Sequence, residues 1–231
     1  MWDGKKKAIT FSFDDGCQQD VELINLLNKY GIKATFNLNT GVAGLDLSFE
    51  QNGRMIKRNI VKLDEIAPRY KGHEVAVHTL HHPDLTSLSD EEVLKEINED
   101  QVNLEKAVGY KIKGMAYPGG LYNDHLVDLI KSKTSIKYAR TAAFSVDSFN
   151  IQNDLYRLNQ FFWLNEGVDF DKLIDDFLRE SNELKVLFIW GHSYEIDVYD
   201  NVLEKWEKLF QKLKDRDDVF FGTNSEVLNL N

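Results

Sequence analysis

A repeated alternation of short apolar runs with amphipathic stretches limits what this 231-residue chain can fold into. The apolar runs have the length and composition of strands, and most are followed by apolar residues at helical spacing. We count about seven or eight such units, with no low-complexity linker and no repeat of solenoid period. This order predicts an α/β fold, a distorted (β/α) barrel with about seven parallel strands. We expect residues 1–231 to form a single domain.

The first apolar run ends on two adjacent carboxylates and a glycine, Asp14, Asp15 and Gly16. Because side chains alternate along a strand, the two acids leave the backbone in different directions and can serve different functions. Gly16 permits a tight turn into a helix predicted over 20–30. The alternative is an ordinary strand-to-helix turn in which an aspartate caps the helix.

The rest of the chain continues the alternation, apart from one segment. Residues 39–57 are rich in Gly, Asn and Ser without a clear period, which predicts a long loop over one end of the sheet. The other expected strands are 33–38, 74–78, 114–117, 136–141, 156–162, 185–190 and 219–222, and the other expected helices cover 63–70, 89–108, 124–132, 170–183, 202–213 and the residues after Thr223.

Polar side chains collect where the predicted strands end, and parallel strands of a barrel end on one face. His78 and His82 follow the strand at 74–78, four residues apart, so one helical turn would bring both imidazoles to one side. With one carboxylate they would form a two-histidine, one-carboxylate metal site, and His81 would point elsewhere. The alternative is that these histidines are ordinary core or surface residues.

The charge and the cysteine content exclude several classes of protein. A net charge of −10 leaves no basic surface for nucleic acid or for an anionic membrane. One cysteine, Cys17, excludes an internal disulfide, and we interpret it as a packed turn residue. No apolar run reaches membrane-spanning length and no signal-peptide core precedes the first strand, so we expect a cytoplasmic protein, although a secreted chain trimmed of its leader would look the same.

Four ordered motifs resemble those of a known family. They are F-S-F-D-D-G at 11–16, H-T-L-H-H-P at 78–83, M-A-Y-P-G-G at 115–120 and I-W-G-H at 189–192. In this order they resemble the polysaccharide deacetylase family, also called the NodB homology domain or carbohydrate esterase family 4. The resemblance implies a distorted β/α barrel that binds one divalent metal, most often Zn²⁺, with Co²⁺, Fe²⁺, Mn²⁺ or Ni²⁺ as alternatives. It also implies removal of acetyl groups from N-acetylated or O-acetylated sugars.

By this resemblance, the metal ligands are Asp15, His78 and His82. The chemistry agrees, because an acetamide is a poor electrophile and needs a metal to polarise its carbonyl. The same metal lowers the pKa of a bound water to about 7 and so supplies hydroxide at neutral pH. Two nitrogens and one oxygen from the protein leave coordination positions open for both tasks.

The resemblance also assigns the proton transfers, to Asp14 as general base and to His192 as general acid. The acid is required because a free amide anion does not leave. For His192 the alternative is a structural histidine in a turn. The oxyanion would be stabilised by the backbone N–H of Gly119, which follows the proline of the third motif.

One departure from the family pattern, and two candidate residues, concern the orientation of the catalytic groups. Many members have an arginine that pairs with the catalytic aspartate where this chain has Ala116. Arg140, near the end of the next predicted strand, is our candidate replacement, with a surface salt bridge as the alternative. Asp147 is a candidate to orient the catalytic histidine and raise its pKa, with an ordinary loop aspartate as the alternative.

Three aromatic residues are candidates for binding the substrate: Tyr117, Trp190 and Tyr194. Trp190 stands where the family commonly has a leucine that lines the acetyl pocket. Each aromatic ring could stack on a sugar or simply pack in the core.

We therefore expect a metal-dependent hydrolase, acting on carbon–nitrogen bonds other than peptide bonds, that deacetylates N-acetylated amino sugars or oligosaccharides. The alternatives are an O-acetyl esterase on acetylated xylan-type sugars, a hydrolase of a cyclic amide, or a carbohydrate-binding module with a lapsed active site. The expected partner is the acetylated sugar, with neither nucleic acid nor membrane, and the sequence leaves the oligomeric state open.

Overall fold

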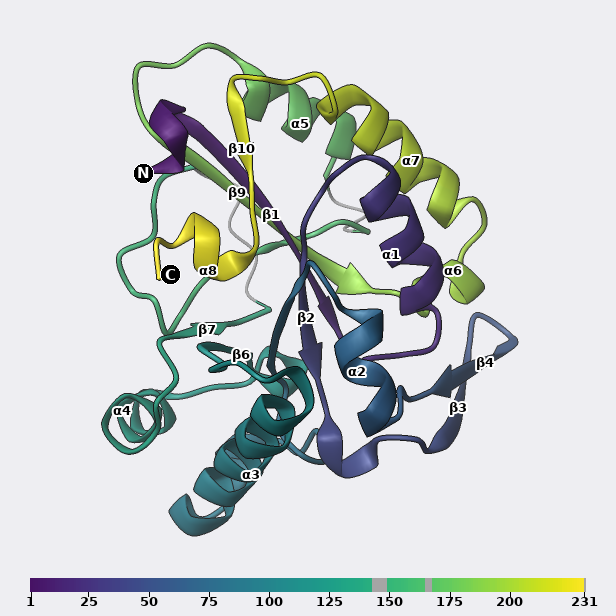
Figure 1. Ribbon diagram of the computed structural model, residues 1–231, viewed down its shortest axis with the longest axis vertical. Coiled ribbons are helices and arrows are strands. Elements are labelled where there is room, and N and C mark those ends of the chain that lie inside the picture. The colour runs from purple at the N-terminus through teal and green to yellow at the C-terminus, as the bar shows by residue number, and fades with distance from the viewer. Residues whose placement is uncertain (143–148, 165–167, 231) are drawn as a thin grey trace.

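A curled, parallel β-sheet forms the centre of the computed structural model, which describes residues 1–142, 149–164 and 168–230 (Figure 1). Seven strands follow one another in the order β7-β6-β5-β2-β1-β9-β8, and β10 pairs with the beginning of β1. This arrangement confirms the predicted α/β fold with about seven parallel strands in a distorted barrel. The strands are β1 (Lys7–Asp14), β2 (Thr35–Leu38), β5 (Glu74–Val77), β6 (Gly114–Ala116), β7 (Tyr138–Arg140), β8 (Phe161–Phe162), β9 (Lys185–His192) and β10 (Val219–Phe221).

The two ends of the curled sheet are joined by the segment that leads into β8. Arg140 in β7 forms a parallel bridge with Leu158, and the backbone N–H of Leu158 donates to the carbonyl of Ala139 at 3.1 Å. Because of this link, the carboxyl ends of β7 and β9 lie on the same curved rim as that of β1.

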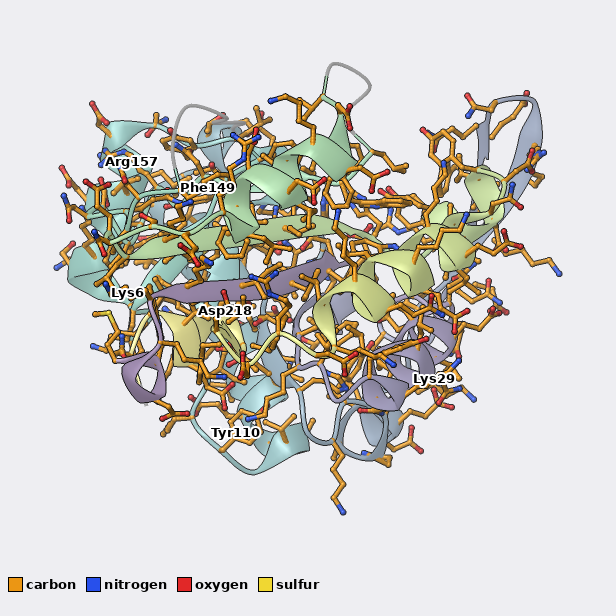
Figure 2. The ribbon with its side chains drawn as sticks, turned by 90° about the horizontal axis from the view of Figure 1, so that it is seen from above. Lys6, Lys29, Tyr110, Phe149, Arg157 and Asp218 are labelled. Atoms are coloured by element: carbon orange, nitrogen blue, oxygen red, sulfur yellow. The ribbon has the colours of Figure 1, made fainter. Side chains whose placement is uncertain are left out.

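Helices surround the sheet on its outer side (Figure 1). Lys29 of α1, labelled in Figure 2, pairs with Glu207 of α7, with its Nζ 2.5 Å from Oε1, and so joins two of these helices. No helix in the described ranges is both long enough and apolar enough to cross a membrane. The helices are α1 (Asp20–Lys29), α2 (Leu63–Arg69), α3 (Asp90–Val108), α4 (Asp124–Lys133), α5 (Phe170–Leu178), α6 (Glu195–Val198), α7 (Val202–Leu213) and α8 (Asn224–Val227).

The two faces of β1 have different environments, and this difference sets the direction of Asp14. Phe11 and Phe13 point outward and pack edge-on against Trp206 of α7, with ring centroids 5.9 and 5.5 Å apart. Thr10 lies on the opposite face and donates to Asn224 of α8, which closes the amino-terminal end of the barrel. Asp14 shares the face of Thr10, so its carboxylate enters the barrel at the other end.

The prediction of a long loop at 39–57 was wrong, because this segment holds most of an antiparallel hairpin. Its strands are β3 (Asp46–Gln51) and β4 (Arg54–Asn59), paired with each other and separate from the main sheet. Asn52 and Gly53 have φ values of 54° and 70°. Asn-Gly with both residues at positive φ is the preferred two-residue hairpin turn. This dipeptide in the sequence would have predicted the hairpin.

Candidate metal and catalytic site

The site lies at the carboxyl ends of β1, β5 and β9. Asp14 is the last residue of β1 and pairs in register with His192, the last residue of β9. Asp15 follows β1 directly, and His78 follows β5, which is separated from β1 only by β2. Residues far apart in the sequence therefore meet on one rim, as the strand-end pattern predicted.

Asp15, His78 and His82 form the cluster that the sequence predicted as metal ligands. Their ligand atoms all lie within 4.8 Å of one another. The Nε2 atoms of His78 and His82 lie 3.7 and 3.8 Å from the same oxygen, Oδ1 of Asp15. The three side chains thus have a common point that one ion could occupy.

The surroundings of this cluster fit a bound cation. Oδ1 of Asp15 is buried and has no hydrogen-bond partner among the described residues, although Nη2 of Arg58 lies 3.2 Å away. Nδ1 of His78 lies 2.9 Å from the carbonyl oxygen of Ala116, so that nitrogen carries the proton and Nε2 is free to bind a metal. A cation between the two imidazoles and the carboxylate would satisfy the buried oxygen.

The backbone between the two histidines differs from the helical turn that we predicted. Thr79 and His82 both have positive φ values, 68° and 59°, and the N–H of His82 donates to Oγ1 of Thr79. This irregular turn, and not a helix, brings His82 back toward His78. His81 points away as predicted: it is exposed, and its Nδ1 lies 2.8 Å from Glu96.

Asp14 is held in the barrel by two neighbours. Both of its carboxylate oxygens contact Nη2 of Arg140, and Nδ2 of Asn37 donates to Oδ1 at 2.8 Å. Arg140 is 1% exposed, so the alternative of a surface salt bridge is wrong. Burial alone would raise the pKa of Asp14, but the charge of Arg140, assisted by nearby histidines, lowers it to about 2. The carboxylate therefore stays ionised, as a proton acceptor must.

His192 is held by a carboxylate that the sequence analysis missed. Its Nδ1 lies 3.0 Å from Oε1 of Glu195, whose other oxygen accepts a hydrogen bond from the indole of Trp163. Burial lowers the pKa of His192, but the hydrogen bond to Glu195 and the nearby acids outweigh it and raise the pKa above its ordinary value. Asp147, our candidate for this task, lies outside the described residues. The missed signal was an acid three residues after the histidine, in a turn.

The three predicted sugar-binding aromatics differ in position. Tyr117 is 1% exposed and its hydroxyl donates to the carbonyl of Tyr156, so its ring packs in the core and cannot stack on a sugar. Tyr194 stacks on His192 with ring centroids 4.7 Å apart. The ring centroid of Trp190 lies 5.4 Å from that of His192, and the guanidinium of Arg140 lies over the Trp190 ring. Tyr194 and Trp190 therefore flank the candidate acid, and their contact with a sugar stays a prediction.

Gly119 lies in the turn after β6, with a φ of 59°. The preceding strand end is joined to the metal cluster by the hydrogen bond between Ala116 and His78. A Cβ on Gly119 would meet only Leu121, at 3.8 Å, so this side of the turn is open. Its role as oxyanion donor stays a prediction.

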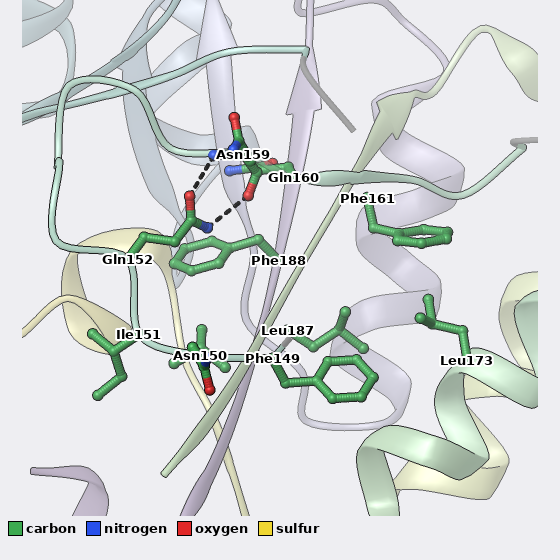
Figure 3. A pocket seen from close by; sticks show the side chains of 11 residues that line it. Phe149, Asn150, Ile151, Gln152, Asn159, Gln160, Phe161, Leu173, Leu187 and Phe188 are labelled. Atoms are coloured by element: carbon green, nitrogen blue, oxygen red, sulfur yellow. Dashed lines mark hydrogen bonds between the residues drawn. The ribbon is translucent and has the colours of Figure 1, made fainter. Parts of the chain in front are cut away.

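A separate cavity of about 200 Å³ lies beside β9, away from these residues (Figure 3). Gln152 and Asn159 form two hydrogen bonds on its wall, and Phe188 of β9 is another lining residue. Gln160 also lines it, and both polar atoms of its buried amide lack a partner within the described ranges. None of the predicted site residues lines this cavity, so we do not assign the chemistry to it.

The fold and the site define a class of protein, α/β proteins with a curled parallel sheet and a candidate metal site at the carboxyl ends of its strands. Within that class, a sequence profile described as polysaccharide deacetylase matches residues 2–135. The chain therefore belongs to the polysaccharide deacetylase family. The match includes the segments that carry Asp15, His78 and His82.

The names of two curated relatives state the sugar that each deacetylates. The chain is 33% identical over 138 residues to the peptidoglycan-N-acetylmuramic acid deacetylase PdaC of Bacillus subtilis, covering 58% of this chain and 26% of the relative. It is 32% identical over 126 residues to the peptidoglycan-N-acetylglucosamine deacetylase PgdA of Listeria monocytogenes, covering 54% of this chain and 24% of the relative. The chain thus spans about a quarter of the length of these relatives.

Solved structures support the fold over nearly the whole chain. The carbohydrate esterase domain of a multidomain xylanase from a termite (Trinervitermes trinervoides) hindgut metagenome has a TM-score of 0.63 at 18% identity, covering 97% of this chain and 91% of that one. PdaC of Bacillus subtilis has a TM-score of 0.59 at 22% identity, covering 98% and 92%. A family member from Bacillus anthracis described as a pseudoenzyme has a TM-score of 0.60 at 18% identity, covering 97% and 66%.

Proposed function

We propose that this protein is a metal-dependent hydrolase that removes the acetyl group from N-acetylated amino sugars of peptidoglycan-type glycans or oligosaccharides. The observation that carries the proposal is the convergence of Asp15, His78 and His82 beside an ionised Asp14. Oδ2 of Asp14 lies 3.8 Å from Nε2 of His78, so the candidate base adjoins the candidate ligands. The peptidoglycan deacetylases among its relatives support this substrate class.

A divalent cation bound by Asp15, His78 and His82 would polarise the acetyl carbonyl and lower the pKa of a water molecule. Two imidazole nitrogens and one carboxylate oxygen suit Zn²⁺, and they also suit other first-row divalent ions. The chain supplies the base: Asp14 is kept charged by Arg140 and can accept a proton from the attacking water.

The departing amine requires a proton from a second group of the site. His192 ends β9 in register with Asp14, and Glu195 holds its Nδ1, so Nε2 is the nitrogen left to donate that proton. The raised pKa of His192 keeps the ring protonated at higher pH than usual, which suits a general acid. The N–H of Gly119 would stabilise the oxyanion from the β6 turn.

Substituting Asp14 by Asn tests the proposal. Removal of a general base costs about 10²–10⁴-fold in turnover, and we expect a loss of this size in acetate release from N-acetylated oligosaccharides. Metal content, measured by elemental analysis, should not change because Asp14 is not among the proposed ligands. Asp46→Asn, on the exposed hairpin, is the matched control and should retain activity. Unchanged acetate release by Asp14→Asn would contradict the assignment.

The same assay should include an O-acetylated xylan oligosaccharide, because fold similarity extends to esterase domains of the family. A wild-type protein that releases acetate only from the ester would overturn the amide assignment. A metal-loaded protein that binds sugars but releases acetate from neither substrate would indicate a binding module.

A further inference from the structure

A second arginine lies at the metal cluster, on a different element from Arg140. Arg58 belongs to β4 of the hairpin, and its Nη2 lies 3.2 Å from Oδ1 of Asp15. This is the same oxygen that faces His78 and His82. The side chain of Arg58 is 23% exposed, so one part is held in the protein while another reaches solvent.

The hairpin that carries Arg58 is fastened close to the site. The N–H of Gln18, in the turn after β1, donates to the carbonyl of Asn59 at 2.8 Å, and Cys17 forms an antiparallel bridge with Ile60. On the other hairpin strand, Phe49 packs edge-on against Tyr194, with ring centroids 5.2 Å apart. The hairpin therefore borders the site from the metal cluster to the candidate acid.

The charge balance around Arg58 depends on what Asp15 binds. Among the described residues, Asp15 provides the one carboxylate within 4 Å of the Arg58 nitrogens, and Nε of Arg58 is buried without a hydrogen-bond partner. Arg140, the other arginine of the site, is paired with Asp14 through its Nη2. If Asp15 binds a divalent cation, its negative charge mainly neutralises that cation. The positive charge of Arg58 is then largely unneutralised.

We propose that Arg58 binds a carboxylate substituent of the substrate, so that the preferred substrate is an acetylated amino sugar that carries an acid. The inference rests on the proposed function. A partly exposed guanidinium that would lie beside a bound cation favours a carboxylate over a neutral group. The protein as a whole carries a net charge of −10 and repels anions, so any preference for an acidic sugar has to come from local cations such as Arg58.

A matched pair of ligands tests this inference: N-acetylmuramic acid, whose lactyl group carries a carboxylate, and its methyl ester, which has nearly the same shape without the charge. Binding to the Zn²⁺-loaded Asp14→Asn variant is measured by calorimetry, and kcat/KM is measured with the wild-type protein. A charge-assisted hydrogen bond corresponds to about ten-fold or more in affinity, so we expect the acid to bind at least ten-fold more tightly than the ester.

Arg58→Gln, made in both backgrounds, should weaken the acid far more than the ester and so reduce this preference to about two-fold, whereas Arg58→Lys should retain part of it. Arg54→Gln is the matched control, because Arg54 lies on the same strand but pairs with Asp200 at the exposed end of the hairpin. Zinc content and thermal midpoint are measured for each variant to confirm a folded, loaded protein.

Two results would overturn the inference: equal binding of acid and ester by the protein with Arg58 intact, or an equal loss for both ligands in Arg58→Gln. The proposed function fails separately. If wild-type protein binds the acid preferentially through Arg58 but releases no acetate from any N-acetylated sugar, the carboxylate site stands and the deacetylase assignment does not.

Discussion

Arg140 shows how a single residue can replace a motif position that the chain lacks. It reaches Asp14 from β7, 126 residues away, and its guanidinium lies over the ring of Trp190. Both partners are buried, so the pair lies in a low-dielectric environment where its loss is costly. The pair therefore affects the stability of the barrel as well as the proton affinity of Asp14.

Arg140→Met should separate these two effects. Breaking a buried ion pair by removing one partner costs about 3–5 kcal/mol, and we expect a loss of this size in urea unfolding. Since Arg140 lowers the pKa of Asp14, its removal should raise that pKa and move the acid limb of the rate profile to higher pH. Arg157→Met is the control: its partners Asp124 and Asp154 are exposed or half-exposed, so it should cost under about 1 kcal/mol. An acid limb that stays in place would contradict Asp14 as the base.

Glu195→Gln should alter the other limb of the same profile. Glu195 raises the pKa of His192, so an uncharged side chain of equal shape should lower it. The protonated, acid form of His192 would then be lost at lower pH, and the basic limb of kcat/KM should move in that direction. We expect a loss of about ten-fold at pH 8, smaller than the loss of about 10² or more that removal of the acid itself would cause. Glu183→Gln, an exposed substitution, should leave the profile unchanged. A basic limb unaffected by Glu195→Gln would exclude His192 as the acid.

At the scale of elements, the sequence predicted the order of the strands of the main sheet and of most helices, because period and capping are local properties, but it missed the β3–β4 hairpin and α6. Ser89 and Glu92 form the capping box that begins α3, as expected. Arg140 could be predicted because a strand end has a known place in a barrel. Glu195 and the turn that returns His82 could not, because their directions depend on backbone angles that no local periodicity encodes.

His73, which precedes β5, makes the packing of three elements sensitive to pH. Its Nδ1 accepts a hydrogen bond from the N–H of Ala34 at 3.2 Å, and its Nε2 lies 3.2 Å from Oδ1 of Asn28 in α1. The ring is therefore neutral with the proton on Nε2. Burial, together with the charge of Lys33, lowers its pKa to about 4 from the ordinary 6.5.

The free energy of unfolding should therefore decrease as pH falls from 6.5 toward 4. In this window His73 is protonated in the unfolded chain but stays neutral in the folded one. The contribution is about 1–2 kcal/mol when solvent screening is allowed for. Urea unfolding at several pH values should show it, and the difference between wild-type protein and His73→Gln should shrink across this window. His81→Gln, an exposed histidine, is the control. Parallel stability curves for wild-type protein and His73→Gln would contradict this account.

At the scale of the whole molecule, the site exists only when the barrel is formed. Asp15 and His78 lie on separate strand ends with β2 between their strands, and His82 depends on the turn after β5. The folded structure holds the ligand atoms of these three side chains within 4.8 Å of one another, and an unfolded chain has no such preformed site. A cation that binds them should therefore bind the folded state and stabilise it by mass action.

Zinc should consequently raise the thermal midpoint. At a free Zn²⁺ concentration about 100-fold above Kd, the gain is about 2.7 kcal/mol, which corresponds to roughly 5–10 °C for a chain of this size. Calorimetric scans with added Zn²⁺ and with a chelator should differ by this amount. In Asp15→Asn the difference should largely disappear, because the oxygen shared by both imidazoles has lost its charge. Asp14→Asn should retain the difference, because Asp14 is held by Arg140 and is not a proposed ligand. Equal midpoints with and without Zn²⁺ in the wild-type protein would mean that these three side chains do not bind the metal together.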